Sequence, residues 1–336
     1  MIMKLKLAFF GTPPFAASFL EKLLTDKDLS IEVKLVVTQP DQPVGRKQIL
    51  TPSPVKLVAQ KHTIDVIESL EFNSKFTTLN SKLQDIDLAI IYYYGRIISK
   101  DILELPQYGF WNIHFSRLPQ YRGTSPATFS LIMGDDETAV SLVLTDAKLD
   151  HGDLIVQKKT SIERDESRIE LESRLNEISY ELVKEKLLSL NSNWKTNLQH
   201  QDHSKATYTL FPTKNHGFIT LSILKKAMNN EPLTTEEIPS LIKDYLEKNN
   251  IRNLKLEIRN SAKIVYDYFR GLSPWPGIWT NVEIKDKITR LKITDVSLNS
   301  QFSSADRQTN FQINKVQLEG KNEVDFLIFN KAYAIF

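Results

Sequence analysis

The stretch LKLAFFGTPPFAASFLEKLLTDKDLSIEVKLVVT, residues 5–38, decides the fold. Leu5–Phe10 is a short apolar run that ends at the turn sequence GTPP, which predicts a buried strand followed by a tight turn. Apolar residues then recur about every four positions from Phe15 to Leu24, which predicts a helix with one apolar face. A second apolar run, Val33–Thr38, predicts another strand. Strand, helix and strand within about 35 residues form a βαβ unit, which predicts a parallel sheet covered by helices.

The rest of the first half continues this alternation. Further strand-like runs are Leu88–Ile91, Phe110–His114, Ala139–Thr145 and Asp153–Lys158. The spacing of Leu171, Leu175, Ile178 and Leu182 predicts a long helix after them. We therefore predict an α/β domain over residues 1–190, with a doubly wound, mostly parallel sheet.

The pattern changes in the second half. Residues 191–216 are polar and lack periodicity, which predicts a linker. Helical stretches follow near Thr235–Asn249 and Ser261–Leu272. Short alternating runs then predict strands at Thr289–Val296, Phe311–Leu318 and Asp325–Phe329. We expect residues 217–336 to form a second domain, with a helical lead-in and a small all-β sandwich or barrel.

The composition excludes several classes of function. The formal net charge of the 336 residues is only +2, so binding to nucleic acid or membrane must be argued from a local patch. The sequence has no cysteine, which excludes disulfides, thiolate nucleophiles and thiolate metal ligands. The apolar run at the amino terminus is too short for a signal peptide, and no stretch is long enough to span a membrane. We therefore expect a cytoplasmic protein.

The segment WNIHFSRLPQYRGTSPA, residues 111–127, holds the strongest candidate for a site. Asn112 and His114 lie two apart in a predicted strand, so their side chains project from one face at its carboxyl end. Ligands of open α/β sheets bind outside the carboxyl ends of the strands. An amide and an imidazole offer two donors to one oxygen, as a carbonyl that becomes an oxyanion requires. A histidine at a strand end is also often a purely structural residue, so the spacing alone leaves both interpretations open.

A carboxylate could hold the His114 imidazole in one tautomer. The glycine-bearing segment LDHGDLI, residues 149–155, lies between two predicted strands and could bring one there. Spacing alone leaves Asp146, Asp150 and Asp153 as equal candidates. The six histidines form no spaced cluster with carboxylates, so we predict no metal site.

Several of these segments resemble the folate-dependent formyltransferase family. NIHFSRLPQYRGTSP, residues 112–126, is similar to the family signature N-x-H-x-S-L-L-P-x-x-R-G-x-x-P, and LDHGD, residues 149–153, to its L-D-x-G-D element. FFGTPPFA, residues 9–16, resembles the family's opening turn. VTQPDQPVGRKQILTPSPVKLVA, residues 37–59, and GLSPWPGIWT, residues 271–280, resemble the branch that acts on a charged tRNA. Arg117 departs from the signature, because it stands where the family has a leucine.

The resemblance implies a fold and a reaction. The fold is a doubly wound, Rossmann-like sheet followed by a small OB-like β-barrel. The reaction is transfer of the formyl group of 10-formyltetrahydrofolate to the α-amine of methionine on the initiator tRNA, a step of translation initiation. The partners are therefore the folate and the initiator methionyl-tRNA, and we expect a monomer without membrane contact.

The resemblance also implies roles for individual residues. Asn112 and His114 would hold the formyl oxygen, while Asp150 positions His114 or manages protons. The folate would lie on the loop Ser116, Arg117, Leu118 and Pro119, and against the backbone of Tyr94 and Gly95. Arg46 and Lys47 would face the acceptor end of the tRNA, and Arg122 would shape the wall of the cleft.

The charge of the second half agrees in sign with a partner that carries phosphates. Residues 201–336 hold 19 Lys and Arg against 15 Asp and Glu. The candidate phosphate contacts are Lys205, Lys214, Lys225, Lys226, Lys263 and Arg270, each of which could equally be a solvated charge.

Three alternatives remain open at this point. A formyltransferase that acts on a nucleotide-linked amino sugar would share the same three polar residues and differ in the acceptor. A formyltransferase of the purine pathway would be a single domain. A protein that binds nucleotide or RNA without catalysis could use the same scaffold, although the chain lacks a G-x-G-x-x-G turn and a P-loop.

Overall fold

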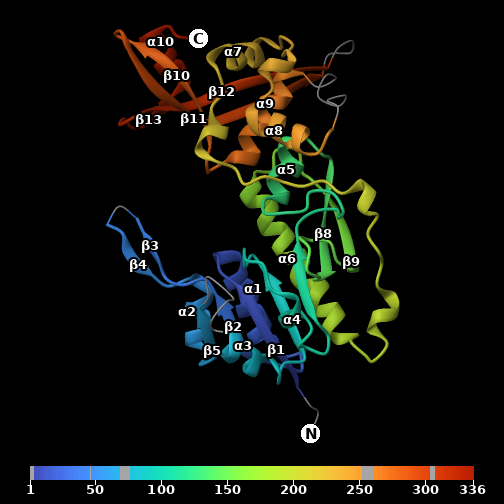
Figure 1. Cartoon of the computed structure of the whole chain (residues 1–336). Coiled ribbons are helices and arrows are strands. Elements are labelled where there is room, and N and C mark those ends of the chain that lie inside the picture. The colour runs from blue at the N-terminus through green and yellow to red at the C-terminus, as the bar shows by residue number, and fades with distance from the viewer. Residues whose placement is uncertain (1–3, 46, 69–75, 252–259, 303–306) are drawn as a thin grey trace. The chain divides into compact units, whose positions relative to one another are not determined.

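The computed structural model describes residues 4–45, 47–68, 76–251, 260–302 and 307–336 (Figure 1). The chain forms two compact units that interleave along the sequence. The first comprises Met1–Arg122, Ala139–Thr160 and Glu172–Ala206, and the second comprises Gly123–Thr138, Ser161–Leu171 and Thr207–Phe336. The domain boundaries predicted at residues 190 and 216 stay a prediction, because compactness alone does not show which segments fold independently.

Seven strands form the sheet of the first unit, in the order β5-β2-β1-β6-β7-β8-β9. Their bounds are β1 Leu5–Gly11, β2 Ile31–Thr38, β5 Asp65–Glu68, β6 Leu88–Tyr92, β7 Phe110–His114, β8 Glu137–Leu144 and β9 Leu154–Ser161. The strands from β5 to β7 are parallel, whereas β8 pairs antiparallel with β7. The strand order reverses at β1 and β6, and such a switch point opens a ligand crevice beyond the carboxyl ends of the strands.

Helices cover both faces of this sheet because neighbouring residues of each strand point to opposite sides. Their bounds are α1 Pro14–Thr25, α2 Pro54–Lys61, α3 Phe76–Leu83, α4 Lys100–Leu103 and α6 Arg168–Leu188. Phe9 stacks on Phe19 of α1, which in turn contacts Tyr180 of α6. Phe10, the next residue of β1, points to the other face and meets Phe110 and Tyr94.

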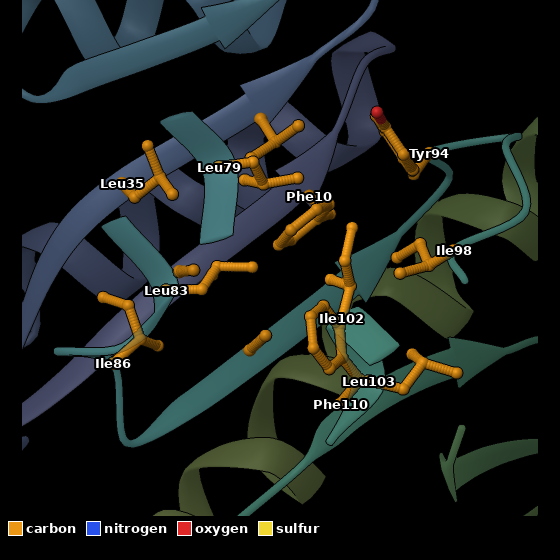
Figure 2. Close-up of a cluster of buried hydrophobic side chains, with 13 residues drawn as sticks. Phe10, Leu35, Leu79, Leu83, Ile86, Tyr94, Ile98, Ile102, Leu103 and Phe110 are labelled. Atoms are coloured by element: carbon orange, nitrogen blue, oxygen red, sulfur yellow. The ribbon is translucent and has the colours of Figure 1, made fainter. Parts of the chain in front are cut away.

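Figure 2 shows the cluster around Phe10, in which Leu79 and Leu83 come from α3 and Ile102 and Leu103 from α4. All of these side chains are buried, so the cluster removes a large apolar area from water and stabilises this side of the sheet. The cluster includes Tyr94 and therefore anchors the loop that follows β6.

A short hairpin extends from the carboxyl end of β2 (Figure 1). It consists of β3 Gln42–Val44 and β4 Ile49–Thr51, which pair antiparallel. Its side chains are largely exposed, including the apolar Val44, Ile49 and Leu50. At its base, Lys56 of α2 forms ion pairs of 2.8 Å with both Asp41 and Glu68.

The second unit combines helices with an antiparallel sheet. Its helices are α5 Pro126–Ile132, α7 Leu221–Asn229, α8 Ser240–Lys248, α9 Ser261–Leu272 and α10 Phe326–Tyr333. Its strands are β10 Ile278–Ile284, β11 Lys287–Phe302, β12 Arg307–Leu318 and β13 Glu323–Asp325, in sequential order. α5 packs closely on α9, since a methyl group added at Gly271 would lie 2.5 Å from the Ile132 side chain.

The fold class predicted from the sequence is confirmed: a mostly parallel sheet between helices precedes a small antiparallel β module. The strand predicted at Asp325–Phe329 is wrong, because Asp325 caps a helix instead. Its Oδ1 accepts hydrogen bonds from the backbone N–H of Leu327 and Ile328, at 2.8 and 3.3 Å. Helix α7 was not predicted at all. Among the described residues, no helix is long and apolar enough to cross a membrane.

Candidate active site

The carboxyl ends of β6 and β7 bring the predicted site residues to one edge of the sheet. Ile91 pairs with Asn112, so the loop after β6, which contains Tyr94 and Gly95, lies beside the end of β7. His114 is the last residue of β7 and is buried. Asn112 lies one pleat before it on the same face and is half-buried.

Asn112, His114 and Asp150 converge in three dimensions. The Asn112 Nδ2 donates a hydrogen bond to the Asp150 Oδ1 at 2.9 Å, and the other carboxylate oxygen, Oδ2, lies 3.6 Å from the His114 Nδ1. The side chains of His114 and Asp150 are only 6% and 8% exposed. The carboxylate is thus shared between an amide and an imidazole where little water competes for either.

The tautomer of His114 follows from its second partner. The His114 Nε2 lies 2.9 Å from the carbonyl oxygen of Tyr121, which can only accept. The Nε2 therefore carries a proton, and the Nδ1 is the ring atom that faces Asp150. A separation of 3.6 Å is longer than a direct hydrogen bond, so a small movement or a bridging group can make or break this contact.

The three aspartates left open by the sequence have different partners. Asp150 faces Asn112 and His114, whereas Asp146 bonds to His151 and Asp153 to His200, each at 2.6 Å. Asp150 reaches its position through a left-handed backbone with φ +48°. That conformation is uncommon for a residue with a side chain, so its neighbours must hold it.

The folate loop predicted at residues 116–119 turns its serine and leucine inward. The Ser116 hydroxyl donates to the Gln120 carbonyl at 2.6 Å, and the Ser141 hydroxyl donates to the Ser116 carbonyl at 2.6 Å. Leu118 packs with Val143 and Leu154, and a cis peptide joins it to Pro119. The Arg117 side chain is exposed, so the residue that departs from the family signature does not disturb the packing beneath the loop.

The other residues predicted to bind folate flank the same edge. Tyr94 is buried in the cluster of Figure 2, and burial raises the pKa of its hydroxyl to about 12. Its carbonyl accepts a 2.9 Å hydrogen bond from the Gln39 Nε2. Gly95 is exposed with φ +72°, and a methyl group added there would contact the Gln39 side chain at 3.3 Å.

Two groups of basic residues were predicted to contact the tRNA, one near its acceptor end and one along its phosphates. Lys47 is exposed in the turn between β3 and β4, whereas Arg46 lies outside the described residues. In the second unit Lys214 and Lys225 are exposed. Lys205, Lys226 and Lys263 form ion pairs with Asp202, Glu237 and Asp267, respectively. Arg270 is buried against Asp267 and two backbone carbonyls, so its prediction as a phosphate contact is wrong.

Sequence reasoning assigned Arg122 to the wall of the cleft but missed its two side-chain partners, Gln201 and His203. Arg122 is only 1% exposed, and its Nη2 lies 2.7 Å from the Gln201 Oε1 and 2.8 Å from the His203 Nδ1. The His203 ring stacks on His151, with centroids 3.8 Å apart. Desolvation, His151 and Arg122 lower the pKa of His203. The polar segment 191–216 carried no periodic signal by which these residues could have been found.

Within the residues that the structure describes, no three His, Cys, Asp or Glu side chains group as metal ligands. The three side chains at this edge of the sheet supply an amide donor, a carboxylate and an imidazole that can carry a proton. Such a set suits the transfer of an acyl group between two nitrogen atoms.

Comparisons with known proteins agree with this chemistry. The Formyl transferase family matches residues 4–187. The methionyl-tRNA formyltransferase of Caldicellulosiruptor saccharolyticus is 32% identical over 311 residues, which cover 92% of this chain and 86% of the relative. That of Bacillus cytotoxicus is 33% identical over 278 residues, which cover 83% and 76% of the two chains.

A solved structure shares the fold along the chain. The N-formyltransferase from Helicobacter canadensis, in complex with folinic acid and dTDP-3-aminofucose, matches with a TM-score of 0.54. The match covers 93% of this chain and 94% of that one, at 17% identity. The family predicted from the sequence motifs is thus confirmed: the chain belongs to the formyl transferase family, in the branch of the methionyl-tRNA formyltransferases.

Proposed function

We propose that this enzyme transfers the formyl group of 10-formyltetrahydrofolate to the α-amine of methionine on the initiator tRNA. The observation that carries the proposal is the trio of Asn112, His114 and Asp150 at the carboxyl edge of the sheet. The acceptor of the formyl group is inferred from the sequence identity to methionyl-tRNA formyltransferases over most of the chain. This function would place the enzyme in the cytoplasm, and we propose that it acts there as a monomer.

The trio offers donors for the charge that develops on the formyl oxygen. The amide nitrogen of Asn112 has two N–H groups, one of which donates to Asp150. The second N–H is available to the formyl oxygen, together with the Nδ1–H that His114 carries when its imidazole is protonated, since the Nε2–H is directed at the Tyr121 carbonyl. Donors that are already oriented stabilise the developing negative charge without reorganisation, which is the largest contribution expected of such a site.

The remaining task is to move protons. The methionine amine must be deprotonated to attack, and it loses a further proton as its new bond to the formyl carbon forms. The bond from the formyl carbon to N10 then breaks, and N10 takes up a proton. His114 and Asp150 face each other at 3.6 Å and are the groups placed to accept one proton and return another.

Features of the loops fit the two substrates. Gly95 exposes its backbone without a side chain, so a flat pterin ring can approach it. The side chains of Ser116 and Leu118 point into the protein. The surface that faces the pterin ring from the side opposite Gly95 is therefore the backbone of the loop 116–119. The hairpin β3–β4, with Lys47 at its turn, supplies an exposed arm for the acceptor end of the tRNA.

The proposal is tested by offering alternative acceptors. Purified enzyme is mixed with 10-formyltetrahydrofolate and either initiator methionyl-tRNA or a nucleotide-linked amino sugar. Release of tetrahydrofolate is followed together with formylation of each acceptor. We expect formyl-methionyl-tRNA as the product. Formylation of the amino sugar alone would replace the proposed acceptor, and no turnover with either would refute the activity.

A further inference from the structure

A buried glutamine connects the polar segment after α6 to the loop that carries Asp150. The Gln201 Nε2 donates to two backbone carbonyls of that loop, those of Asp150 at 2.9 Å and Gly152 at 2.7 Å. Its Oε1 accepts from the Arg122 Nη2 at 2.7 Å. The side chain is only 6% exposed. Both the nitrogen and the oxygen of this amide therefore form hydrogen bonds within the protein, and little water competes for either.

The segment that carries Gln201 is itself fastened to the sheet. Gln199 and Leu154 exchange two backbone hydrogen bonds of 2.8 and 2.9 Å, so the chain runs beside the first residue of β9. Gln201 follows two residues later and reaches back to the loop before β9. The loop 149–153 is thus held from one side by β8 and from the other by Gln201.

The loop needs such support because its conformation is constrained. Asp150 has a left-handed backbone, and Gly152 lies so close to β8 that an added methyl group would meet the Leu144 carbonyl at 1.8 Å. The backbone carbonyls of Asp150 and Gly152 point inward, and a buried carbonyl without a hydrogen-bond donor would destabilise the fold. Gln201 supplies both donors from one side chain, which fixes the orientation of the Asp150 peptide.

We propose that Gln201 is a positioning residue for the formyl transfer. It holds the backbone of Asp150 so that the carboxylate meets Asn112 and His114, and it acts on the reaction through Asp150 alone. This inference rests on the proposed function for its kinetic test. Gln201 belongs to the polar segment 191–216 predicted as a linker, and its position gives part of that segment a role in the site.

The decisive substitution is Gln201→Glu. It keeps the length of the side chain and the oxygen that accepts from Arg122, but it replaces the donating nitrogen with an oxygen that faces two carbonyls. The matched control is Gln199→Glu, because Gln199 is exposed, lies two residues away, and undergoes the same change of charge. Gln201→Met, which removes both hydrogen-bonding groups without adding charge, serves if Gln201→Glu does not fold.

We expect Gln201→Glu to lower kcat about 10- to 100-fold. Displacement of a catalytic group such as the Asp150 carboxylate by about 1 Å can reduce the rate by that factor. The KM values for folate and tRNA should change by less than about threefold, and Gln199→Glu should resemble the wild type. In an Asp150→Ala background, Gln201→Glu should cost less than about threefold, because the group that it positions is gone. An equal loss of kcat in both backgrounds would overturn the inference.

Hydrogen exchange provides a measurement that does not depend on activity. Gln201→Glu should speed exchange in peptides that cover residues 146–155, whereas Gln199→Glu should not. If the wild type formylates no methionyl-tRNA, the proposed function fails while this test of the loop still decides the inference. Unchanged exchange in Gln201→Glu would show that Gln201 does not hold the loop.

Discussion

At the scale of single residues, the site consists of a few side chains, most of which have more than one partner. One oxygen of the Asp150 carboxylate accepts a hydrogen bond from the Asn112 amide, and the other faces the His114 imidazole at 3.6 Å. His114 is held from its far side by the Tyr121 carbonyl, which leaves one ring nitrogen toward Asp150. Each of the three residues therefore depends on the other two, and single substitutions should have large, non-additive effects.

Asn112→Ala tests the role of the amide in the formyl transfer. It removes a donor to the formyl oxygen and a partner of Asp150, and we expect kcat to fall about 100- to 1000-fold. Binding of folate should change little. Asn197→Ala, an exposed asparagine of the same unit, is the control and should retain full activity. Near-normal turnover of Asn112→Ala would refute the assignment of this side chain.

Gly152→Ala tests the fit of the loop against β8. The added methyl group would lie 1.8 Å from the Leu144 carbonyl, so the loop must move and Asp150 with it. We expect activity to fall at least as far as in Asn112→Ala, together with a lower midpoint of thermal unfolding. Gly320→Ala is the control, because no atom lies within 4 Å of the added group and only the strain of its positive φ remains. Unchanged activity of Gly152→Ala would contradict the tight packing of this loop.

At the scale of elements, the sequence predicted what regular hydrophobic patterns encode. The bounds of β7, Phe110–His114, and of α9, Ser261–Leu272, agree residue for residue with the predicted runs. The strand predicted at Asp325–Phe329 failed because one capping aspartate outweighed a short apolar run. Gln201 could not be found from the sequence, because its role comes from contacts between segments far apart in the chain and not from any local pattern.

Packing of α6 against α1 includes an ionic contact that should respond to acid. The Asp26 Oδ2 lies 2.8 Å from the Lys184 Nζ and accepts from the Tyr180 hydroxyl. Lys184, and then Tyr180, lower the pKa of Asp26 to about 2. A carboxylate whose pKa is lowered on folding contributes stability that is complete above its unfolded pKa of 3.8 and is lost as the pH falls toward 2.

Lys184→Met should therefore make the free energy of unfolding less sensitive to acid, because it removes this contact. The variant should be less stable than the wild type near pH 6, and the difference between them should shrink as the pH falls from about 4 to about 2. Urea unfolding at several pH values measures this directly. Lys186→Met, two residues along the same helix, is the control, since its partner is Glu185 at 3.7 Å. A difference that does not vary with pH would rule out Asp26 as the titrating group.

At the scale of the whole molecule, the protein is only weakly basic, and its excess of basic side chains lies in the second half of the chain. The net charge is +2 over the entire chain, while residues 201–336 carry 19 basic against 15 acidic side chains. Lys205, Lys226, Lys263 and Arg270 are engaged by carboxylates within the protein. Lys214 and Lys225 are the exposed members of the predicted set and are therefore the better candidates for phosphate contacts.

Binding of tRNA should consequently weaken with salt, because each neutralised phosphate releases counterions. We expect the logarithm of the association constant to fall linearly with the logarithm of salt concentration. Lys214→Met with Lys225→Met should reduce that slope by about one for each phosphate that the protein no longer neutralises. The double variant Lys321→Met with Lys331→Met removes the same charge from the same unit and should leave the slope unchanged. Filter-binding titrations over a range of salt distinguish the two. Equal slopes in both double variants would mean that net charge, and not Lys214 and Lys225 in particular, governs the interaction. A slope of zero in the wild type would exclude phosphate contacts altogether.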